Sequence, residues 1–266
     1  MSLPSTPRRT DVSVCMASYC GAQFIDEQIR SILAQLSETD ELVVVDDAST
    51  DDTAAAVRSI GDHRIRFFEQ PENQGYVRTF ERALAEARGD FVLLADQDDV
   101  WPDGRVAAMR TALERADVVA GNLDLLSADR PIPGPLGIRE WRLPRIGRRA
   151  PLRNVLGIVC GIMPYFGCAM GFRRSFADRA LPFPPWLYES HDLWLAVVGN
   201  LAGDLVHIPD TVTLRRLHDD NASPSQPRSL PQIARSRLLV LRMIREARLR
   251  RRANPASTST PRKPIR

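Results

Sequence analysis

Short apolar runs alternate, along the first half of the chain, with segments whose apolar residues recur at helical spacing. The runs predict β-strands, and they lie at 12–17, 41–45, 64–68, 91–95 and 117–121. The segments between them predict helices at 22–35, 49–60, 76–87 and 103–115. Strands that are apolar throughout, rather than at every second residue, are typical of a sheet buried on both faces. The order predicts an α/β fold with a mostly parallel central sheet flanked by helices.

The pattern is less regular after residue 122. Residues 126–151 are rich in Pro, Gly and Arg and predict a long loop. Residues 155–172 carry no charge, but Gly and Pro interrupt them five times, which favours core strands joined by a turn over a membrane span. Further on we expect a helix from 190 or 191 to about 201, short strands at 205–208 and 211–214, a loop at 222–229 and a basic helix at 230–252. We expect residues 1–10 to be flexible and residues 253–266 to be disordered.

Composition places the chain among soluble globular proteins. Its 266 residues are 44% hydrophobic and 26% charged, and a formal charge of +3 gives no sign of a nucleic-acid partner. The four cysteines lack metal-ligand spacing, and Cys15 and Cys160 lie in apolar runs, so we expect both to be buried and the compartment to be reducing. The N-terminus has no apolar segment of the kind found in signal peptides, which favours a cytoplasmic location.

The motif Asp96-Gln97-Asp98-Asp99 directly follows one predicted strand. Three carboxylates in four positions repel one another, and a hard divalent cation such as Mg²⁺ or Mn²⁺ offsets that repulsion. A second acidic pair, Asp46-Asp47, ends another strand. Because the carboxyl ends of parallel strands share one edge of the sheet, we expect the two acidic segments to lie close together. A solvated turn for the first motif, and helix capping for the second, are the alternatives.

The scarcity of lysine excludes two other classes that use acids after a strand. A phosphoacceptor receiver domain and a P-loop nucleotide hydrolase each need a lysine near the phosphoryl group. The chain has only Lys263, which lies near its C-terminus.

The ordered set of motifs resembles the family 2 glycosyltransferases of GT-A fold, and within them the bacterial rhamnosyltransferase-like branch. The segments that carry the resemblance are VSVCMASYCG at 12–21, EQIRSILAQ at 27–35, VDDASTDDT at 45–53, NQG at 73–75, GDF to DQDDVW at 89–101, HDLW at 191–194 and RLHDDN at 216–221. The resemblance covers residues 11–222. It implies a nucleotide-sugar half at 11–122 and an acceptor and catalytic half at 123–222.

The resemblance also implies roles for single residues. Asp192 would be the catalytic base, and Asp98 with Asp96 would bind the metal, while Asp99 would support the sugar or the metal shell. The remaining substrate-binding residues would be Ser18 and Tyr19 at the nucleobase, Asp46 and Asp47 at the pyrimidine or ribose, Arg78 at the diphosphate, and Arg216 and His218 over the diphosphate or metal. A solvated helix face is an equal expectation for Arg78. Arg215 departs from the family, which commonly has an aromatic residue there.

The implied reaction is an inverting transfer from a dTDP- or UDP-linked sugar, with rhamnose as one candidate, to a saccharide or lipid-linked acceptor of cell-surface polysaccharide synthesis. Mg²⁺ or Mn²⁺ would be the cofactor. One alternative is a catalytically idle binding module, against which the intact Asp98 and Asp192 argue. The other is a nucleotidyltransferase, which needs a basic Gly-rich signature where residues 16–21 have no Lys or Arg.

The basic segment at 230–252 carries eight arginines opposed only by Glu246. Its apolar residues can share one helical face, namely Ile233, Val240, Leu241, Ile244 and Ala247. Such a helix either lies on an anionic membrane, as peripheral contact with the inner face of the cytoplasmic membrane, or packs this face on the catalytic domain.

Overall fold

The structure is a computed structural model, and it describes residues 10–127, 130–144, 150–218 and 229–253. In the first half, strands and helices alternate: β1 (Val12–Ser18), α1 (Ile25–Leu33), β2 (Glu41–Asp46), α2 (Thr53–Ser59), β3 (Ile65–Glu69), α3 (Tyr76–Glu86), β4 (Phe91–Ala95), α4 (Arg105–Leu113) and β5 (Val118–Leu125). The second half contains β6 (Arg130–Pro131), η1 (Pro135–Gly137), α5 (Pro151–Cys160), η3 (Gly167–Ala169), β7 (Met170–Arg173), α6 (Arg174–Ala180), α7 (His191–Ala202), β8 (Leu205–Arg215) and α8 (Leu230–Ala253).

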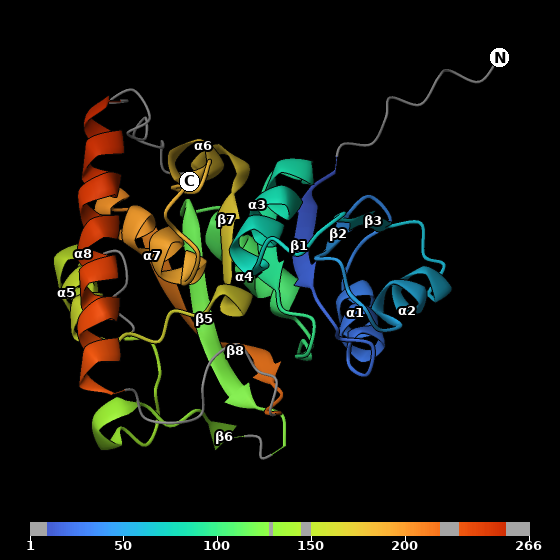
Figure 1. Cartoon of the computed structure of the whole chain (residues 1–266), viewed down its shortest axis with the longest axis horizontal. Helices are drawn as coiled ribbons and strands as arrows, with labels where there is room; N and C mark the ends of the chain where they lie inside the picture. The colour runs from blue at the N-terminus through green and yellow to red at the C-terminus, as the bar shows by residue number, and fades with distance from the viewer. Residues whose placement is uncertain (1–9, 128–129, 145–149, 219–228, 254–266) are drawn as a thin grey trace.

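One eight-stranded sheet forms the centre of the molecule (Figure 1). The strand order is β3-β2-β1-β4-β7-β5-β6, and β8 pairs with β5 outside this path. The neighbours β3, β2, β1 and β4 are parallel, as are β5 and β8, whereas β7 runs antiparallel to both β4 and β5. The predicted mostly parallel α/β sheet is therefore confirmed.

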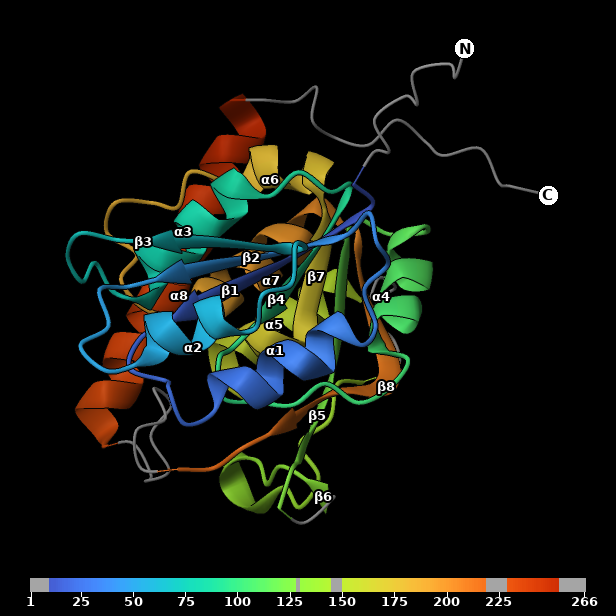
Figure 2. The same ribbon diagram turned by 90° about the vertical axis from the view of Figure 1, so that its right-hand side faces the viewer.

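The sheet is covered on both faces because its strands are apolar at successive positions. In β2, Val43 and Val45 point into one buried cluster, and Leu42 and Val44 point into the other. The first cluster contains side chains of α3, α5, α6, α7 and α8, and the second contains side chains of α1, α2 and α4. Figure 2 shows α1 and α2 on the opposite side of the sheet from α3. The period of two along a strand thus produces two cores.

Three predictions for the second half are wrong. Residues 155–160, where we expected a core strand, belong to helix α5, and Gly161, with φ of 73°, follows the last turn of this helix. Cys160 is exposed at the end of this helix. The two short strands expected at 205–208 and 211–214 are one strand, β8, which continues past a register shift opposite Asn122. Among the described residues, no helix is long and apolar enough to cross a membrane.

Helix α8 packs one face on the domain. Val240, Met243, Ile244 and Ala247 are buried, and the helix contacts α5, α6 and α7. Leu241, which we expected on this face, is instead 51% exposed, because it lies about 100° around the helix from Val240. The apolar face therefore belongs to the core. The expectations for residues 1–9, 219–228 and 254–266 fall outside the described residues.

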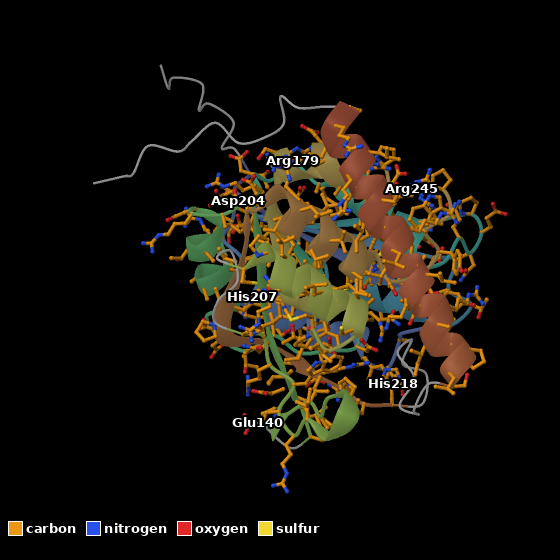
Figure 3. The ribbon with its side chains drawn as sticks, turned by 90° about the vertical axis from the view of Figure 1, so that its left-hand side faces the viewer. Glu140, Arg179, Asp204, His207, His218 and Arg245 are labelled. Atoms are coloured by element: carbon orange, nitrogen blue, oxygen red, sulfur yellow. The ribbon has the colours of Figure 1, made fainter. Side chains whose placement is uncertain are left out.

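The outer surface of α5 and α8 combines leucine with arginine. Figure 3 shows the two helices side by side on one face of the molecule, with Arg245 on α8. Leu152 and Leu156 of α5 are 71% and 63% exposed, and Leu238 of α8 is 67% exposed. We call this surface the α5–α8 face and define it by Leu152, Leu156, Leu238, Leu241, Leu249, Arg242, Arg245, Arg248 and Arg252, all of which are exposed.

Candidate active site at the carboxyl edge of the sheet

The acidic segments after β2 and β4 flank the end of β1, which lies between these two strands. Ser18, the last residue of β1, pairs in register with Asp46 and donates its hydroxyl hydrogen to that carboxylate, with Oγ and Oδ1 2.9 Å apart. Gln97 joins the loop after β4 to the loop after β1. Its side-chain amide accepts from the Tyr19 N–H and donates to the Tyr19 carbonyl, each over 2.9 Å. The segments that follow β1, β2 and β4 thus lie together at the carboxyl edge of the sheet.

The nucleobase-side candidates differ in exposure. Ser18 is buried and its hydroxyl is used by Asp46, whereas the Tyr19 side chain is about half exposed. Tyr19 therefore offers an aromatic face to the open edge of the sheet, and Ser18 shapes the strand end from within.

Both carboxylates of the β2 segment accept several hydrogen bonds. Asp46 accepts from the backbone N–H of Ser49 over 2.8 Å and from its hydroxyl over 2.6 Å, in addition to Ser18. Asp47 accepts from the side chain of Gln70 and from the backbone N–H groups of Gln74 and Gly75, over 2.7, 2.8 and 2.9 Å. Gly75 is the residue before α3. Asp47 therefore secures the start of α3, rather than the α2 cap considered from the sequence.

The carboxylates after β4 lie beside other acids, and the structure shows fewer hydrogen bonds to them. Asp99 is only 2% exposed and accepts from the Arg216 N–H over 3.2 Å, and Asp98 Oδ2 lies 2.7 Å from His218 Nε2. Burial, followed by the charges of Asp96 and Asp98, raises the pKa of Asp99 to about 8. Burial and the charge of Asp98 raise the pKa of Asp96 to about 6. This loop would gain from a bound cation.

The metal-ligand geometry differs from the sequence expectation in one respect. Asp96, Asp99 and Cys168 bring one potential ligand atom each within 4.8 Å of one another. Asp98, our first choice as metal ligand, faces His218 in this arrangement. Burial raises the pKa of the Cys168 thiol well above its ordinary value, so sulfur remains a neutral neighbour. Hard cations prefer the carboxylate oxygens of this group.

Residues 214–218 cross the acidic loop. Val100 and Leu214 form an antiparallel bridge, and Arg216 donates to the Asp98 carbonyl over 3.2 Å and to Glu27 of α1 over 2.5 Å. The His218 ring contacts the ring of Phe24, with centroids 4.6 Å apart. Arg216 and His218 thus lie beside the acidic loop and also contact residues at the start of α1. Asp219, Asp220 and Asn221 of the expected motif fall outside the described residues.

Asp192 lies in the first turn of α7, and its Oδ1 accepts from the Leu193 N–H over 2.7 Å. Its charge adds to the raised pKa of Asp96, after burial and the charge of Asp98, which are the larger causes. The start of α7 also packs closely against Gly167, the residue before Cys168. Gly167 permits this approach, because a Cβ there would lie 2.9 Å from His191 Nε2 and 3.6 Å from Asp192 Cβ. The glycine lets η3, which carries Cys168, pack against the start of α7.

His191 was missed by sequence reasoning. It is buried and stacks on Phe80 with ring centroids 4.4 Å apart, and neither ring nitrogen has a hydrogen-bond partner in the described part of the chain. Burial lowers its pKa to about 3, so the ring is neutral at ordinary pH. The one feature of the sequence that could have drawn attention to His191 is its position directly before Asp192.

Arg78 lies on α3 and contacts the loop before α7. Its guanidinium pairs with Glu81 over 2.6 Å and donates to the carbonyls of Pro184 and Leu187 over 2.8 and 3.3 Å. Neither of the two expectations for Arg78 describes this arrangement, because the loop before α7 supplies acceptors that a diphosphate or water would otherwise provide. Arg78 therefore joins α3 to the loop before α7.

Arg105 was also missed by sequence reasoning. It begins α4, is 1% exposed, and lies under the acidic loop, where it donates to the carbonyls of Leu94 and Cys168 over 2.8 and 2.6 Å. Burial lowers its pKa to about 9, against the opposing charges of Asp99 and Asp96. The buried positive charge of Arg105 therefore opposes the negative charges of Asp96 and Asp99.

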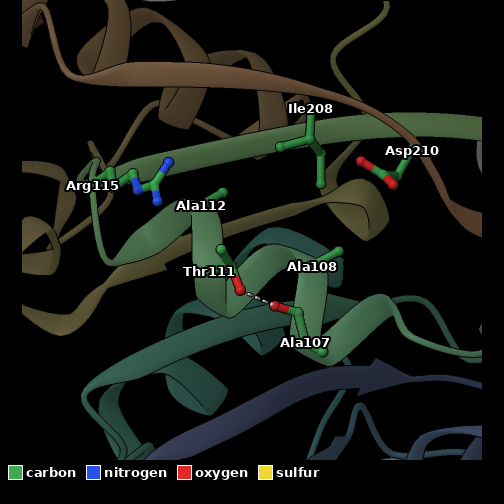
Figure 4. Close-up of a pocket in the computed structure, with 7 residues that line it drawn as sticks. All are labelled: Ala107, Ala108, Thr111, Ala112, Arg115, Ile208 and Asp210. Atoms are coloured by element: carbon green, nitrogen blue, oxygen red, sulfur yellow. Dashed lines mark hydrogen bonds between the residues drawn. The ribbon is translucent and has the colours of Figure 1, made fainter.

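A separate hollow of about 470 Å³ lies on the flank formed by α4 and β8 (Figure 4). Its lining residues are Ala107, Ala108, Thr111, Ala112, Arg115, Ile208 and Asp210. The lining contains none of the acids at the sheet edge, and Thr111 uses its hydroxyl on the Ala107 carbonyl of its own helix. This hollow is not our candidate active site.

A mostly parallel sheet with helices on both faces and acids at its carboxyl edge is the arrangement expected of a GT-A glycosyltransferase fold. The chain belongs to glycosyl transferase family 2, whose model matches residues 13–179. It is 36% identical over 195 residues to the UDP-Glc:alpha-D-GlcNAc-diphosphoundecaprenol beta-1,3-glucosyltransferase WfgD of Escherichia coli, covering 71% of this chain and 70% of WfgD. It is 37% identical over 135 residues to the succinoglycan biosynthesis protein ExoO of Rhizobium meliloti (strain 1021), covering 48% of this chain but only 38% of ExoO.

Solved structures share the fold at lower sequence identity. S. aureus TarS 1–349 in complex with UDP-GlcNAc matches with a TM-score of 0.65 and 18% identity, covering 92% of this chain and 73% of TarS. Glucosyl-3-phosphoglycerate synthase from Mycobacterium tuberculosis in complex with Mn²⁺, UDP and phosphoglyceric acid matches with a TM-score of 0.58 and 20% identity, covering 90% and 78%. The GT-A fold expected from the sequence is confirmed. The rhamnosyltransferase-like branch stays a prediction, because these similarities identify the family and not a branch within it.

Proposed function

We propose that this chain transfers a sugar from a nucleoside-diphosphate donor to a saccharide or lipid-linked acceptor in the synthesis of a cell-surface polysaccharide. The observation that carries the proposal is the acidic loop Asp96–Asp99 at the carboxyl edge of the sheet, in a family 2 fold. Asp192 begins α7, which packs against the η3 segment that carries Cys168 of the same group. WfgD, which the chain resembles over most of its length, is named for a UDP-glucose donor and a diphosphoundecaprenol-linked acceptor. UDP- and dTDP-linked sugars, rhamnose included, are the donors to test.

A divalent cation, Mg²⁺ or Mn²⁺, fits the acidic loop. Asp96, Asp98 and Asp99 would hold it, with His218 beside Asp98, because hard cations prefer carboxylate oxygens and the raised pKa values of Asp96 and Asp99 reflect uncompensated negative charge. When bound, the cation would neutralise charge that develops on the leaving nucleoside diphosphate. Tyr19 would pack on the nucleobase, while Asp46 and Ser18 would shape its pocket.

Asp192 would accept the proton of the acceptor hydroxyl as its oxygen attacks the anomeric carbon. Attack from the face opposite the leaving group inverts the configuration and requires no covalent enzyme intermediate. General bases contribute about 10²–10⁴-fold to such reactions. Arg216, the residue after β8, would meet the diphosphate, and Asp47 would hold the loop that ends at Gly75 against the ribose side.

The test is a panel of UDP- and dTDP-sugars with Mn²⁺ or Mg²⁺, followed by release of the nucleoside diphosphate in the presence of saccharide and polyprenyl-diphosphate-sugar acceptors. Asp98→Asn should abolish metal-dependent turnover and leave the fold intact. Asp103→Asn is the matched control, because Asp103 is an exposed acid just outside the loop. Binding of a donor without turnover would favour an idle binding module. Wild-type turnover in Asp98→Asn at limiting metal would refute its assignment as a metal ligand.

We also propose peripheral contact with an anionic membrane through the α5–α8 face. Exposed leucines interleaved with arginines suit the interface between lipid headgroups and acyl chains. The one acid described on α8, Glu246, already pairs with Arg250 over 3.1 Å, so the outer arginines dominate the charge. A lipid-linked acceptor would give such contact a purpose.

Sedimentation with vesicles of phosphatidylglycerol and phosphatidylcholine tests this contact. Arg245→Glu combined with Leu238→Glu should release the protein into the supernatant at low salt. Arg30→Glu is the control, because Arg30 lies on α1 in the opposite layer of the molecule. Cosedimentation unchanged by the double substitution, or absent in the wild-type protein, would refute the contact.

A further inference from the structure

The guanidinium of Arg105 connects three separate segments of the chain. It donates to the carbonyl of Leu94 at the end of β4, to the carbonyl of Cys168 in η3, and to the carbonyl of Val212 in β8 over 2.8, 2.6 and 2.7 Å. It also donates to the hydroxyl of Thr213, which in turn donates to the Cys168 carbonyl over 2.9 Å. Gly104, with φ of 81°, turns the chain directly before Arg105 begins α4.

Each of these segments leads into the candidate active site. Leu94 lies two residues before Asp96. Cys168 follows Gly167, which packs against the start of α7 and so against Asp192. Thr213 lies three residues before Arg216 on β8. A single side chain therefore sets the relative positions of the acidic loop, the base and the strand that crosses the loop.

The charge and stacking of Arg105 suit this position. Its guanidinium carbon lies 3.7 Å from the centre of the Trp101 ring, which fixes the plane of the group. Asp96 and Asp99 both act on it electrostatically, so the cation offsets part of their mutual repulsion before any metal is present. Lysine would keep the charge but cannot bridge several acceptors with one planar group.

We propose that Arg105 is a positioning residue, which holds the Asp96–Asp99 loop, the Cys168 segment and the end of β8 in the arrangement that receives metal and donor diphosphate. It acts through the carbonyls it binds and does not touch the substrate. The inference rests on the proposed glycosyl transfer.

Arg105→Lys tests the proposal, with Arg110→Lys as the matched control. Arg110 lies on the same helix but is about half exposed, and pairs with Asp11 over 2.8 Å. Arg105→Lys should remain folded and should lower kcat by about 10²-fold, because the reacting groups lose their alignment. The Mn²⁺ concentration needed for half-maximal activity should rise, with little change in the KM of the acceptor. Arg110→Lys should match the wild type in every constant.

A purely structural role would lower the melting temperature without changing kcat or the Mn²⁺ requirement of the folded enzyme, and that result would overturn the proposal. If Arg105→Lys is insoluble, Thr213→Val removes one acceptor and should shift both constants in the same direction; wild-type constants in Thr213→Val would equally overturn it. Mn²⁺ titration by calorimetry supplies a readout without turnover. A wild type that binds Mn²⁺ but transfers no sugar would contradict the proposed function, while weaker Mn²⁺ binding by Arg105→Lys would still support the positioning role.

Discussion

The raised pKa of Asp99 predicts that the metal-free protein loses stability as the pH rises. The folded-state pKa of about 8 lies above the ordinary 3.8, so between these values the folded state holds a proton that the unfolded state has released. The contribution is fully present below pH 4 and is lost as the pH approaches 8. Asp99→Asn mimics the protonated acid and should remove this loss.

The magnitude follows from the size of the shift. A shift of about four pKa units corresponds to at most about 6 kcal/mol, at about 1.4 kcal/mol per unit. Burial is the largest cause of the shift, and the charges of Asp96 and Asp98 add to it, so we assign about half of this upper limit to Asp99 itself. Asp99→Asn should therefore exceed the wild type in unfolding free energy by about 2–3 kcal/mol at pH 8 and by little at pH 4.

Urea denaturation in the presence of a chelator, at pH 4.5, 6 and 8, measures the difference. His191 and His207, whose pKa values are lowered by burial, titrate in both proteins and cancel in the comparison. Asp103→Asn should follow the wild type. Added Mn²⁺ should stabilise the wild type at pH 8 and stabilise Asp99→Asn less. A difference between Asp99→Asn and the wild type that is the same at all three pH values would refute the reasoning.

Two further substitutions test the base and the packing of α8. Asp192→Asn should lower kcat by about 10²–10⁴-fold while donor affinity stays within about twofold. Steady-state rates and a titration of donor binding measure the two effects separately. If donor binding is lost and the residual rate is unchanged, Asp192 caps the N-terminal end of α7 and is not the base. Met243→Ala should lower the unfolding free energy by about 2–5 kcal/mol, because Met243 is fully buried against the domain, and urea denaturation with a wild-type midpoint would contradict that packing.

The first half of the fold could be predicted because its local signals agree with its tertiary arrangement. The apolar run Phe91–Ala95 is a buried strand, and Asp96–Asp99 therefore lies at the carboxyl edge, as expected. The error at α5 has a physical cause. Leu152 and Leu156 are exposed while Val155 and Ile158 are buried, so apolar side chains cover both sides of the helix and leave no periodicity to read.

The site residues that were missed depend on contacts between distant segments. An arginine in the first turn of a helix reads as a solvated charge, yet Arg105 finds its acceptors at Leu94, Cys168 and Val212. The same holds for Arg78, which reads as a phosphate ligand or a surface residue until the loop at 183–187 supplies carbonyls beside it. Propensity and spacing carry no information about such partners.

Both acidic segments follow a buried strand in the sequence, but their surroundings in the structure differ. Asp46 and Asp47 each accept hydrogen bonds from several N–H and O–H donors, so their negative charge is already stabilised and it fixes the loops that follow β2 and β3. Asp96 and Asp99 have raised pKa values because burial and neighbouring acids leave their charge poorly compensated. A divalent cation gains most where carboxylate charge is least satisfied. The metal site that we propose after β4 rather than after β2 therefore rests on the hydrogen-bond donors that surround each acidic segment, and not on the number of acids in it.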